Sequence, residues 1–475
     1  HSNGQIYAPE NGLGVTGTYP PFPDPPCYGL ADPVANNPGP QPDELLRLLE
    51  GRYYGHPNPY RDECVFKDGS FQGVAPLPNY EPPMYLLGDH KSANGMIEYA
   101  SDAFCGEMQG DLLIANFSVG DDITRIKLSS DGLSVESSST LAGGFNDPLP
   151  LAQGPDGTIY VGEFSANLVT ALTPLDIGCW STRQSMPILT LDAVGTAVDG
   201  KLYALAGKST NGYLSTLYIY DPAADSWSSG PDKPGPGLED VIVTSYNSKL
   251  YAFGGATAPF SGSVTAAQVF DPNTSIWSSL APMPAPRMGG TAGVIGNLIY
   301  VAGGFDENGG SVDTLFIYDP VANSWSTGPS MLERRDHAGS AVLDGKLYVF
   351  GGRTRNSDGT TLNPTLQSVE MFDPGTGNWT PQAPMPTGRR TMVVGTLNGK
   401  AQLIGGENTP NGGAFEQNEE YDPVTDSWKT LSPMLTPRHG AAGATIDNVI
   451  YVAGGGVVAG TSYSDVVEAF EKQSP

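Results

Sequence analysis

The chain has 475 residues, including 61 glycines and 42 prolines, and only 16% of its residues carry charge. Its 51 acidic and 24 basic residues give a net charge of −27, which repels phosphate backbones and anionic lipids and argues against nucleic acid or a membrane surface as a partner. No run approaches the roughly 20 apolar residues of a membrane-spanning helix, and the composition favours short strands and turns over helices.

The first 42 residues contain ten prolines, including the run YPPFPDPP, and predict an extended arm. A short helix is expected to follow at DELLRLLEG, residues 43–51. The chain opens HSNGQ, with neither an initiator methionine nor a signal-peptide core, so we expect a processed chain or part of a longer one.

Residues 43–175 carry three phrases that suggest a second structural unit. The phrases are ELLRLLEGRYYGHPNPYRDECV, SANGMIEYASDAFCGEMQGDLLIANFSVGDDITRIKLSSDG and GFNDPLPLAQGPDGTIYVGEFSANLVTALTP. They resemble the soluble quinoprotein glucose/sorbosone dehydrogenase-like propellers, which implies β-propeller blades. Only the later part of such a domain is covered, and that family's catalytic histidine and quinone contacts come from earlier blades. His56 matches a structural turn of the family, so we expect no dehydrogenase activity from this chain alone.

The cysteines and the glycosylation sequons suggest a secreted protein. The four cysteines, Cys27, Cys64, Cys105 and Cys179, all precede the repeats described next and have no CxxC spacing, so zinc is a poor interpretation. An even number of dispersed cysteines predicts two disulfides of undetermined pairing in an oxidising compartment, with free buried thiols as the alternative. Sequons at Asn116, Asn273 and Asn378 are candidates for glycosylation.

From about residue 190 an apolar strand recurs six times and ends in a glycine pair in five of them, as in SKLYAFGG, NLIYVAGG and GKLYVFGG, whereas the first reads GKLYALAGK. A second apolar strand follows and ends in an Asp-Pro turn and a tryptophan, as in QVFDPNTSIW and FIYDPVANSW. All six tryptophans keep this register, 47 to 54 residues apart. That period is typical of a propeller blade with four strands.

These phrases, together with Pro-Met-Pro at residues 282–284 and 384–386, resemble the Kelch repeat over residues 180–475. The last repeat ends without a tryptophan strand, whereas CWSTRQSMPI, residues 179–188, is such a strand without a repeat. We therefore expect an all-β protein: an arm (1–42), a partial propeller segment (43–175) and a six-bladed Kelch-like propeller (176–475) closed by its N-terminal strand.

An arginine stands 13 residues before the tyrosine position of four repeats, and the remaining two repeats carry Thr190 and Leu238 there. The four are Arg287, Arg335, Arg389 and Arg438. The preferred interpretation is structural, with the arginines pairing to the Asp-Pro aspartates and tying neighbouring blades together. The alternative is a ring of guanidinium groups around a channel mouth that binds carboxylate or sulfate, as in an acidic sugar.

Glu239 and Asp240 lie in a repeat that lacks the arginine. They are interpreted as exposed loop carboxylates, with acid/base groups as the alternative. His337 and His439 follow two of the arginines at different offsets and are expected to be hydrogen-bonding histidines rather than metal ligands.

We therefore expect a secreted, non-enzymatic binding or structural protein, extracellular or at the cell surface, that engages glycans or proteins. Self-assembly into a surface assembly or filament is one form of this role. No cofactor and no metal are expected. Two enzymatic alternatives stay open: a quinone-dependent sugar dehydrogenase completed by upstream blades, and isomerisation of an acidic sugar, as implied by a resemblance to Kelch sialate mutarotases.

Overall fold

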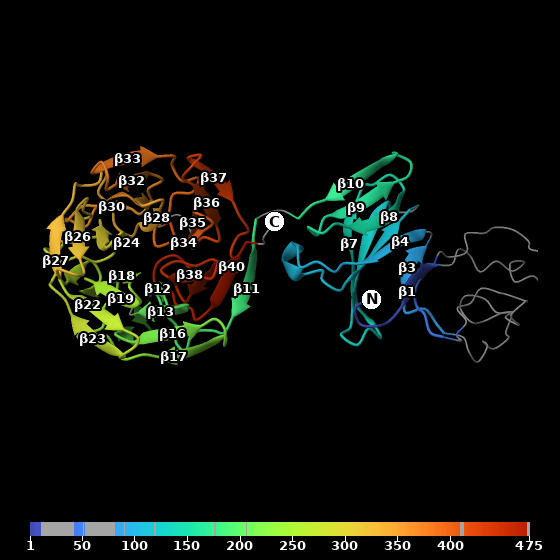
Figure 1. The fold of residues 1–475 in the computed structure, drawn as a ribbon, viewed down its shortest axis with the longest axis horizontal. Coiled ribbons are helices and arrows are strands. Elements are labelled where there is room, and N and C mark those ends of the chain that lie inside the picture. The colour runs from blue at the N-terminus through green and yellow to red at the C-terminus, as the bar shows by residue number, and fades with distance from the viewer. Residues whose placement is uncertain are drawn as a thin grey trace, which may run out of the picture. The chain divides into compact units, whose positions relative to one another are not determined.

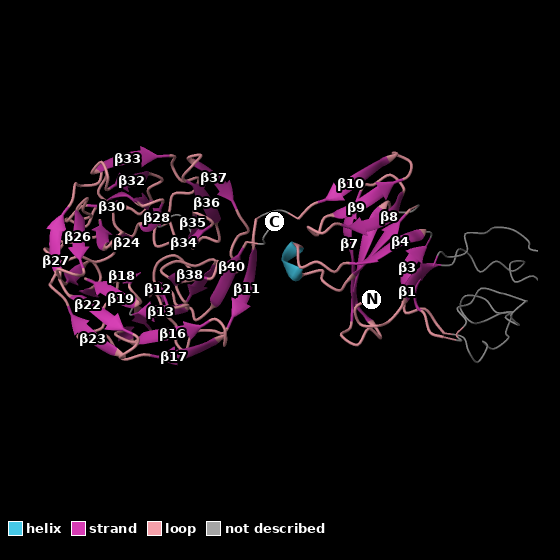
Figure 2. Ribbon diagram, in the orientation of Figure 1, coloured by secondary structure: helices cyan, strands magenta, loops and turns pink. Residues whose placement is uncertain are grey.

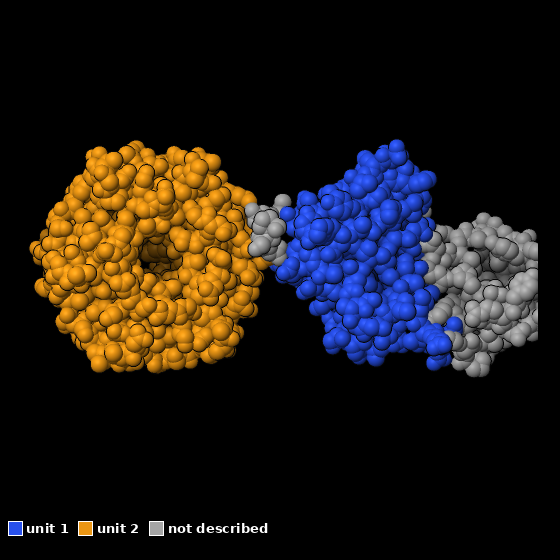
Figure 3. All heavy atoms as spheres, viewed as in Figure 1, with its two compact units in different colours: residues 1–175, 475 blue, residues 176–474 orange. Residues whose placement is uncertain are grey.

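A computed structural model of the chain describes all residues except 11–41, 51, 53–80, 90, 118–119, 175–176, 206, 409–412 and 473–475. The chain divides into two compact units, unit 1 (residues 1–175) and unit 2 (residues 176–474), shown in different colours in Figure 3. Strands dominate both units, and the helix drawn in Figure 2 is a single 3-10 turn, Phe104–Gly106. The all-β fold class expected from the sequence is confirmed.

Unit 1 holds three antiparallel sheets within its described residues. The first has the order β1 (Tyr7–Glu10), β2 (Pro42–Arg47), β3 (Tyr85–Asp89). The second has the order β4 (Ala93–Glu98), β5 (Leu112–Asn116), β6 (Asp122–Leu128), β7 (Val135–Gly143). The third has the order β8 (Pro148–Gln153), β9 (Ile159–Glu163), β10 (Leu168–Leu172). Strands β4 and β5 contact β8, so the second and third sheets lie beside each other around an apolar core.

The beginning of unit 1 differs from two expectations. DELLRLLEG does not start a helix, because residues 42–47 form β2 between β1 and β3. A helix of this length is marginal by itself, whereas the strand buries Leu45 and Leu46. Residues 7–10 of the expected arm form β1 against β2, and most of the remaining arm, like His56, lies outside the described residues.

The described residues of unit 2 form six four-stranded antiparallel sheets arranged around a channel (Figures 1 and 3). From the innermost strand outward, the first three are β12 (Val194–Val198), β13 (Lys201–Leu205), β16 (Leu217–Asp221), β17 (Ser226–Ser229); β18 (Ile242–Tyr246), β19 (Lys249–Phe253), β22 (Ala267–Asp271), β23 (Ile276–Ser279); and β24 (Thr291–Ile295), β25 (Leu298–Ala302), β26 (Leu315–Asp319), β27 (Ser324–Thr327).

The other three sheets are β28 (Gly339–Leu343), β29 (Lys346–Phe350), β32 (Val369–Asp373), β33 (Asn378–Gln382); β34 (Val393–Leu397), β35 (Lys400–Ile404), β36 (Asn418–Asp422), β37 (Ser427–Thr430); and β38 (Ala442–Ile446), β39 (Val449–Ala453), β40 (Val467–Glu471), β11 (Cys179–Arg183). Short hairpins at the loops pair β14 (Lys208–Ser209) with β15 (Gly212–Tyr213), β20 (Ala256–Ala258) with β21 (Ser261–Ser263), and β30 (Thr354–Arg355) with β31 (Thr361–Asn363).

The innermost strands touch their neighbours in turn, and β38 contacts β12, so the ring of sheets is continuous. Small residues allow the innermost strands of neighbouring sheets to come this close. A Cβ added to Gly195 in β12 would lie 2.8 Å from the backbone nitrogen of Gly443 in β38. The second strand of each sheet is nearly all buried, which explains the apolar run before each glycine pair.

Residues 179–183 form β11, which pairs with β40 as the outermost strand of the last sheet. Trp180 lies opposite Phe470, with ring centroids 5.2 Å apart, and its Nε1 donates to the carbonyl of Ser432 at 2.8 Å. The same bond recurs around the ring: the indoles of Trp227, Trp277, Trp325, Trp379 and Trp428 donate to the carbonyls of Gln184, Pro231, Ala281, Pro329 and Ala383. Each tryptophan thus fastens its sheet to the segment that follows the outer strand of the preceding sheet.

Candidate functional site

The four repeated arginines are buried within their own sheets, with 0 to 5% of each residue exposed. Three of them pair with a glutamate on the third strand: Arg335 with Glu370, Arg389 with Glu419 at 2.8 Å and Arg438 with Glu468 at 3.0 Å. Arg287 has no such glutamate and lies 4.9 Å over the ring of Phe316, which occupies the same register position.

The aspartate partners expected for these arginines are wrong. Four of the five Asp-Pro aspartates pair instead with lysines at the start of the second strand, such as Asp221 with Lys201 and Asp271 with Lys249, both at 2.9 Å. The arginines also donate to main-chain carbonyls inside their sheets, for example Arg389 to Leu403 at 2.7 Å. None of the four lines either of the cavities described below, so their geometry fits a structural role within each sheet.

The residues just after the arginine position build the site. In all six sheets the first of them forms an isolated antiparallel bridge with the residue after the glycine pair, or after Ala206-Gly207 in the first sheet. The bridges are Leu191–Lys208, Glu239–Ala256, Met288–Phe305, Asp336–Arg353, Arg390–Glu407 and His439–Gly456. The bridge places one side chain from each of these two positions at the end of the channel where the innermost strands begin.

The second residue after the arginine position turns into the left-handed region in every sheet, with φ between 50° and 60°. We name these six residues the turn ring: Asp192, Asp240, Gly289, His337, Thr391 and Gly440. Backbone N–H groups of the turn ring donate to the carbonyl of the preceding member, with 2.7 Å from His337 to Gly289 and 3.0 Å from Thr391 to His337. A left-handed conformation costs a non-glycine residue about 1–2 kcal/mol, and such strain concentrates at functional sites.

Two glycines of the turn ring create the space for its charged members. A Cβ added to Gly289 would lie 3.1 Å from the imidazole of His337, and a Cβ added to Gly440 would lie 2.4 Å from the carboxylate of Asp192. Any other residue at either position would displace the neighbouring functional group.

A cavity of about 200 Å³ lies against the turn ring. Its lining includes Asp192, Lys208, Glu239, Asp240, Pro259, Phe260, His337, Arg353, Arg390, Glu407 and His439. Ten ionisable or aromatic side chains therefore converge here from five of the six sheets, although the backbone around them repeats regularly.

His337 is held between two carboxylates. Its Nδ1 lies 2.6 Å from Oδ1 of Asp336, and its Nε2 lies 3.1 Å from Oδ1 of Asp240. Burial opposes a charge on the ring, but the two aspartates raise the pKa of His337 to about 10. Burial opposes the charge on Asp240, but the charge and hydrogen bond of His337, together with the charges of Arg353 and Lys208, lower the pKa of Asp240. At neutral pH the site therefore contains an imidazolium that donates to both carboxylates.

Two further carboxyl groups titrate near neutrality. Burial, reinforced by repulsion from Asp240, raises the pKa of Asp192 to about 8. Burial, again with Asp240 as the neighbouring charge, raises the pKa of Glu239 to about 7. Protonated carboxylic acids and an ionised aspartate thus occur together in one small cavity, which is the combination that proton transfer and hydrogen-bond recognition use.

Two guanidinium groups also line the cavity. Nε of Arg353 donates to Asp336 at 2.8 Å, and Nη2 of Arg390 donates to Glu407 at 2.8 Å. Phe260, on the β20–β21 turn, stands at the mouth with φ of 57° and 39% exposure, and the guanidinium of Arg355 lies 3.9 Å from its ring centroid. The cavity therefore offers charged donors, carboxyl groups and one aromatic face.

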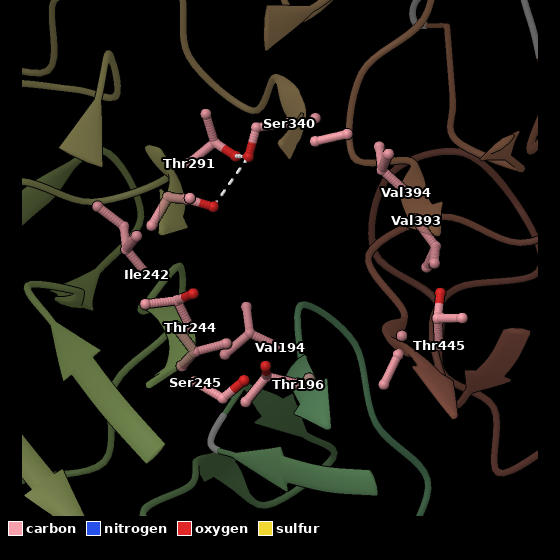
Figure 4. A pocket seen from close by; sticks show the side chains of 18 of the residues that line it. Val194, Thr196, Ile242, Thr244, Ser245, Thr291, Ser340, Val393, Val394 and Thr445 are labelled. Atoms are coloured by element: carbon pink, nitrogen blue, oxygen red, sulfur yellow. Dashed lines mark hydrogen bonds between the residues drawn. The ribbon is translucent and has the colours of Figure 1, made fainter. Parts of the chain in front are cut away.

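The channel has a different character. A space of about 500 Å³ is lined by the innermost strands and contains serine, threonine and small apolar side chains (Figure 4). Thr291 and Ser340 are hydrogen-bonded across neighbouring sheets, and Ser340 donates to the carbonyl of Ala292 at 3.0 Å. No charged residue lines this space, in contrast to the cavity at its end.

Only 5% of Glu239 is exposed, and both Glu239 and Asp240 line the cavity. The sequence was therefore wrong to indicate exposed loop carboxylates here, and its alternative was acid/base groups. It missed Asp192, Arg353, Arg390 and Glu407, and treated His337 only as a hydrogen-bonding residue. The signal was available at two places in the repeat, namely the two positions after the arginine position and the position after the glycine pair. At both places the repeats carry different residues in register.

The remaining candidates are distributed over both units. Cys105 and Cys179 are disulfide-bonded, and Cys27 and Cys64 lie outside the described residues. Asn116 is fully buried in β5, and its Nδ2 donates to Asp122 and to Thr124, so the folded chain does not present this sequon. The other two sequons, at Asn273 and Asn378, are exposed beside Asp-Pro turns. Among the described residues, no group of three metal-binding side chains is assembled, and no helix is long and apolar enough to cross a membrane.

Six antiparallel sheets around a channel, with an asymmetric charged cavity at one end, define unit 2 as a β-propeller. Comparisons identify its repeats: residues 240–455 match the KLHDC2/KLHL20/DRC7 Kelch-repeats domain and residues 190–234 match the Kelch motif. Unit 2 is a Kelch-repeat β-propeller, a fold typical of protein-binding and scaffold proteins. No comparison bears on the predicted dehydrogenase-like character of unit 1.

Known relatives resemble only part of the chain. Beta-scruin of Limulus polyphemus is 28% identical over 149 residues, which are 30% of this chain and 16% of beta-scruin. Kelch-like protein 15 of Danio rerio is 30% identical over 149 residues, 27% of this chain and 25% of that protein. The chain thus spans a quarter or less of either relative. A solved structure described as "Structure of YjhT" superposes with a TM-score of 0.51 at 17% identity, covering 60% of this chain and 96% of that one, and supports the fold alone.

Proposed function

We propose that this chain is an extracellular or cell-surface binding protein whose Kelch propeller recognises a protein or glycan through the charged cavity. The family type supports protein binding, and two disulfide-bonded cysteines support an oxidising compartment. The surface sequons at Asn273 and Asn378 fit a secreted glycoprotein. Self-assembly at the cell surface belongs to the same proposal.

The observation that carries the proposal is the broken symmetry of the turn ring. Six equivalent positions share one backbone conformation but hold two aspartates, a histidine, a threonine and two glycines. A purely structural turn has no need of this variety, because glycine alone satisfies the left-handed conformation without strain. The variety is explained if the side chains are arranged for one asymmetric ligand.

The test is a binding screen with the full chain, using an array of neutral and acidic glycans and a set of purified cell-surface proteins. Hits are then compared for wild type, Asp192→Asn and Lys346→Ala. Lys346 begins β29, at the opposite end of its hairpin from the turn ring, and serves as the control. We expect at least a tenfold loss of affinity in Asp192→Asn only; equal affinity in all three proteins would remove the cavity from the proposal.

An acid/base enzyme is the second candidate function, because Asp192 and Glu239 have pKa values of about 8 and about 7 beside an ionised Asp240. In isomerisation of an acidic sugar, Asp240 would accept the proton of the anomeric hydroxyl while protonated Asp192 donates to the ring oxygen. The ring C–O bond opens, and closure on the other face returns both protons. Exchange between the anomers of a sialic acid, measured by NMR with and without the protein, tests this; a rate equal to the buffer rate rejects it.

The quinone-dependent alternative would require upstream blades to complete unit 1. Copurifying quinone absorbance in natively purified protein, together with turnover of an aldose by an artificial electron acceptor, is its test. Absence of both in a natively purified chain would reject it.

A further inference from the structure

Within the described residues, the third sheet of unit 1 has three strands. Its order is β8-β9-β10, whereas the adjacent sheet β4-β5-β6-β7 and all six sheets of unit 2 have four strands. Among the described residues, none pairs with the outer edge of β10. A row of unpaired backbone N–H and C=O groups is therefore available along this strand.

The sequence of β10 is that of an interior strand. It reads LVTAL, without charge or proline, and so resembles third strands of unit 2 such as LFIYD. The outermost strands of unit 2 are polar instead, for example SWSS in β17 and SWKT in β37. Natural edge strands are usually protected by charge or proline, and β10 carries neither protection.

Several apolar side chains are exposed around β10. Phe164 is 69% exposed, Val169 66%, Leu168 47% and Tyr160 41%. Val169 lies opposite Gly162 and Ala171 opposite Tyr160, so these residues share the outer face of the sheet. Residues Leu149, Pro150, Phe164, Leu168 and Val169 also line a groove of about 550 Å³. Glu163, the charged group in this groove, is occupied by hydrogen bonds from Thr170 and Asn146.

We propose that β10 pairs antiparallel with β10 of a second copy of this chain, which joins two three-stranded sheets into one of six strands. This deepens the self-assembly part of the proposed function by naming the interface. Every strand pairing among the described residues is antiparallel, and a two-fold axis across β10 brings the same edge to itself in that orientation. The chain carries a net charge of −27, so two copies associate most readily where charge is absent, and β10 has none.

The experiment is sedimentation velocity of the full chain over a dilution series, for wild type, Val169→Lys and Val424→Lys. Val424 is 91% exposed on an Asp-Pro turn of unit 2 and controls for one added charge. We expect a dimer in wild type and Val424→Lys. In Val169→Lys the dissociation constant should rise about tenfold or more, because two added lysines meet at an uncharged ladder. Circular dichroism and thermal melting verify that Val169→Lys is folded.

The outcomes separate the interface from self-assembly in general. Association that persists unchanged in folded Val169→Lys would overturn the β10 interface while leaving self-assembly intact. A wild type that stays monomeric at every concentration would overturn both. Open-ended polymers instead of a dimer would also refute the two-fold pairing, since they require two different edges.

Discussion

Replacing Asp192 by asparagine should stabilise the protein at alkaline pH and leave it nearly unchanged in acid. Asp192 is half-buried, and burial together with repulsion from Asp240 raises its pKa from 3.8 to about 8. Between these values the unfolded chain has released the proton while the folded chain retains it. Stability of the wild type therefore falls as pH rises from about 4 to about 8, and asparagine has no proton to lose.

The size of this stabilisation follows from the shift in the pKa of Asp192. One pKa unit corresponds to 1.36 kcal/mol, so the three pH units from pH 5 to pH 8 give Asp192→Asn a relative gain of about 4 kcal/mol in the free energy of unfolding. Asparagine is nearly isosteric and fits beside Gly440, where space is limited. The gain should therefore arise from charge rather than from altered packing.

Urea denaturation at pH 5, 6, 7 and 8 measures the effect. Asp221→Asn is the matched control, since the pKa of Asp221 is lowered by Lys201 and its removal cannot stabilise at alkaline pH. A difference between Asp192→Asn and wild type that stays constant over this range would show that Asp192 is ionised throughout. The acid/base interpretation of the cavity would then lose its proton donor.

Three further predictions concern the fold. Trp180→Ala removes a half-buried indole and its bond to Ser432 and should destabilise unit 2 by about 2–4 kcal/mol, as measured by thermal melting; a shift no larger than that of an exposed substitution would mean that β11 contributes little to closing the ring. Arg438→Met should cost about 3–5 kcal/mol because it leaves Glu468 buried and unpaired. Adding Glu468→Leu should recover much of this loss in urea denaturation, and no recovery would contradict the pairing. In natively purified protein, glycopeptide mass spectrometry should find glycan on Asn273 and none on Asn116, and occupancy of Asn116 would contradict its burial.

The fold of unit 2 could be predicted because each strand type has its own pattern in the sequence. The buried second strand, the Asp-Pro turn and the tryptophan of the outer strand all recur at one period. The placement of residues 179–183 followed from a strand missing at one end of the repeat series and present at the other. Such an argument needs only counting, because four-stranded antiparallel sheets tolerate few alternatives.

Unit 1 was harder to predict because its pattern is not repeated. DELLRLLEG reads as helix by local propensity, and only β1 and β3 on either side make it a strand. The partner of the arginines was missed for a related reason. Asp-Pro aspartates are conspicuous in the repeat, whereas Glu370, Glu419 and Glu468 lie three residues before the Asp-Pro register and are visible as partners only when the strands are paired.

The candidate site was easier to predict from the sequence than unit 1 but harder than the fold of unit 2. A repeat search looks for what is constant, and the constant arginines are structural: each is buried in its own sheet. The functional candidates are the positions at which the six repeats share one backbone conformation but carry different side chains. At the turn ring every residue has φ between 50° and 60°, which glycine satisfies without strain, yet four of the six residues are not glycine. Strain retained at Asp192, Asp240, His337 and Thr391 must be offset elsewhere, and the rigid ring of sheets supplies that support. Gly289 and Gly440 stand where the side chains of His337 and Asp192 need room. The glycines and the charged residues of the turn ring therefore depend on one another and form one arrangement, rather than a set of independent substitutions.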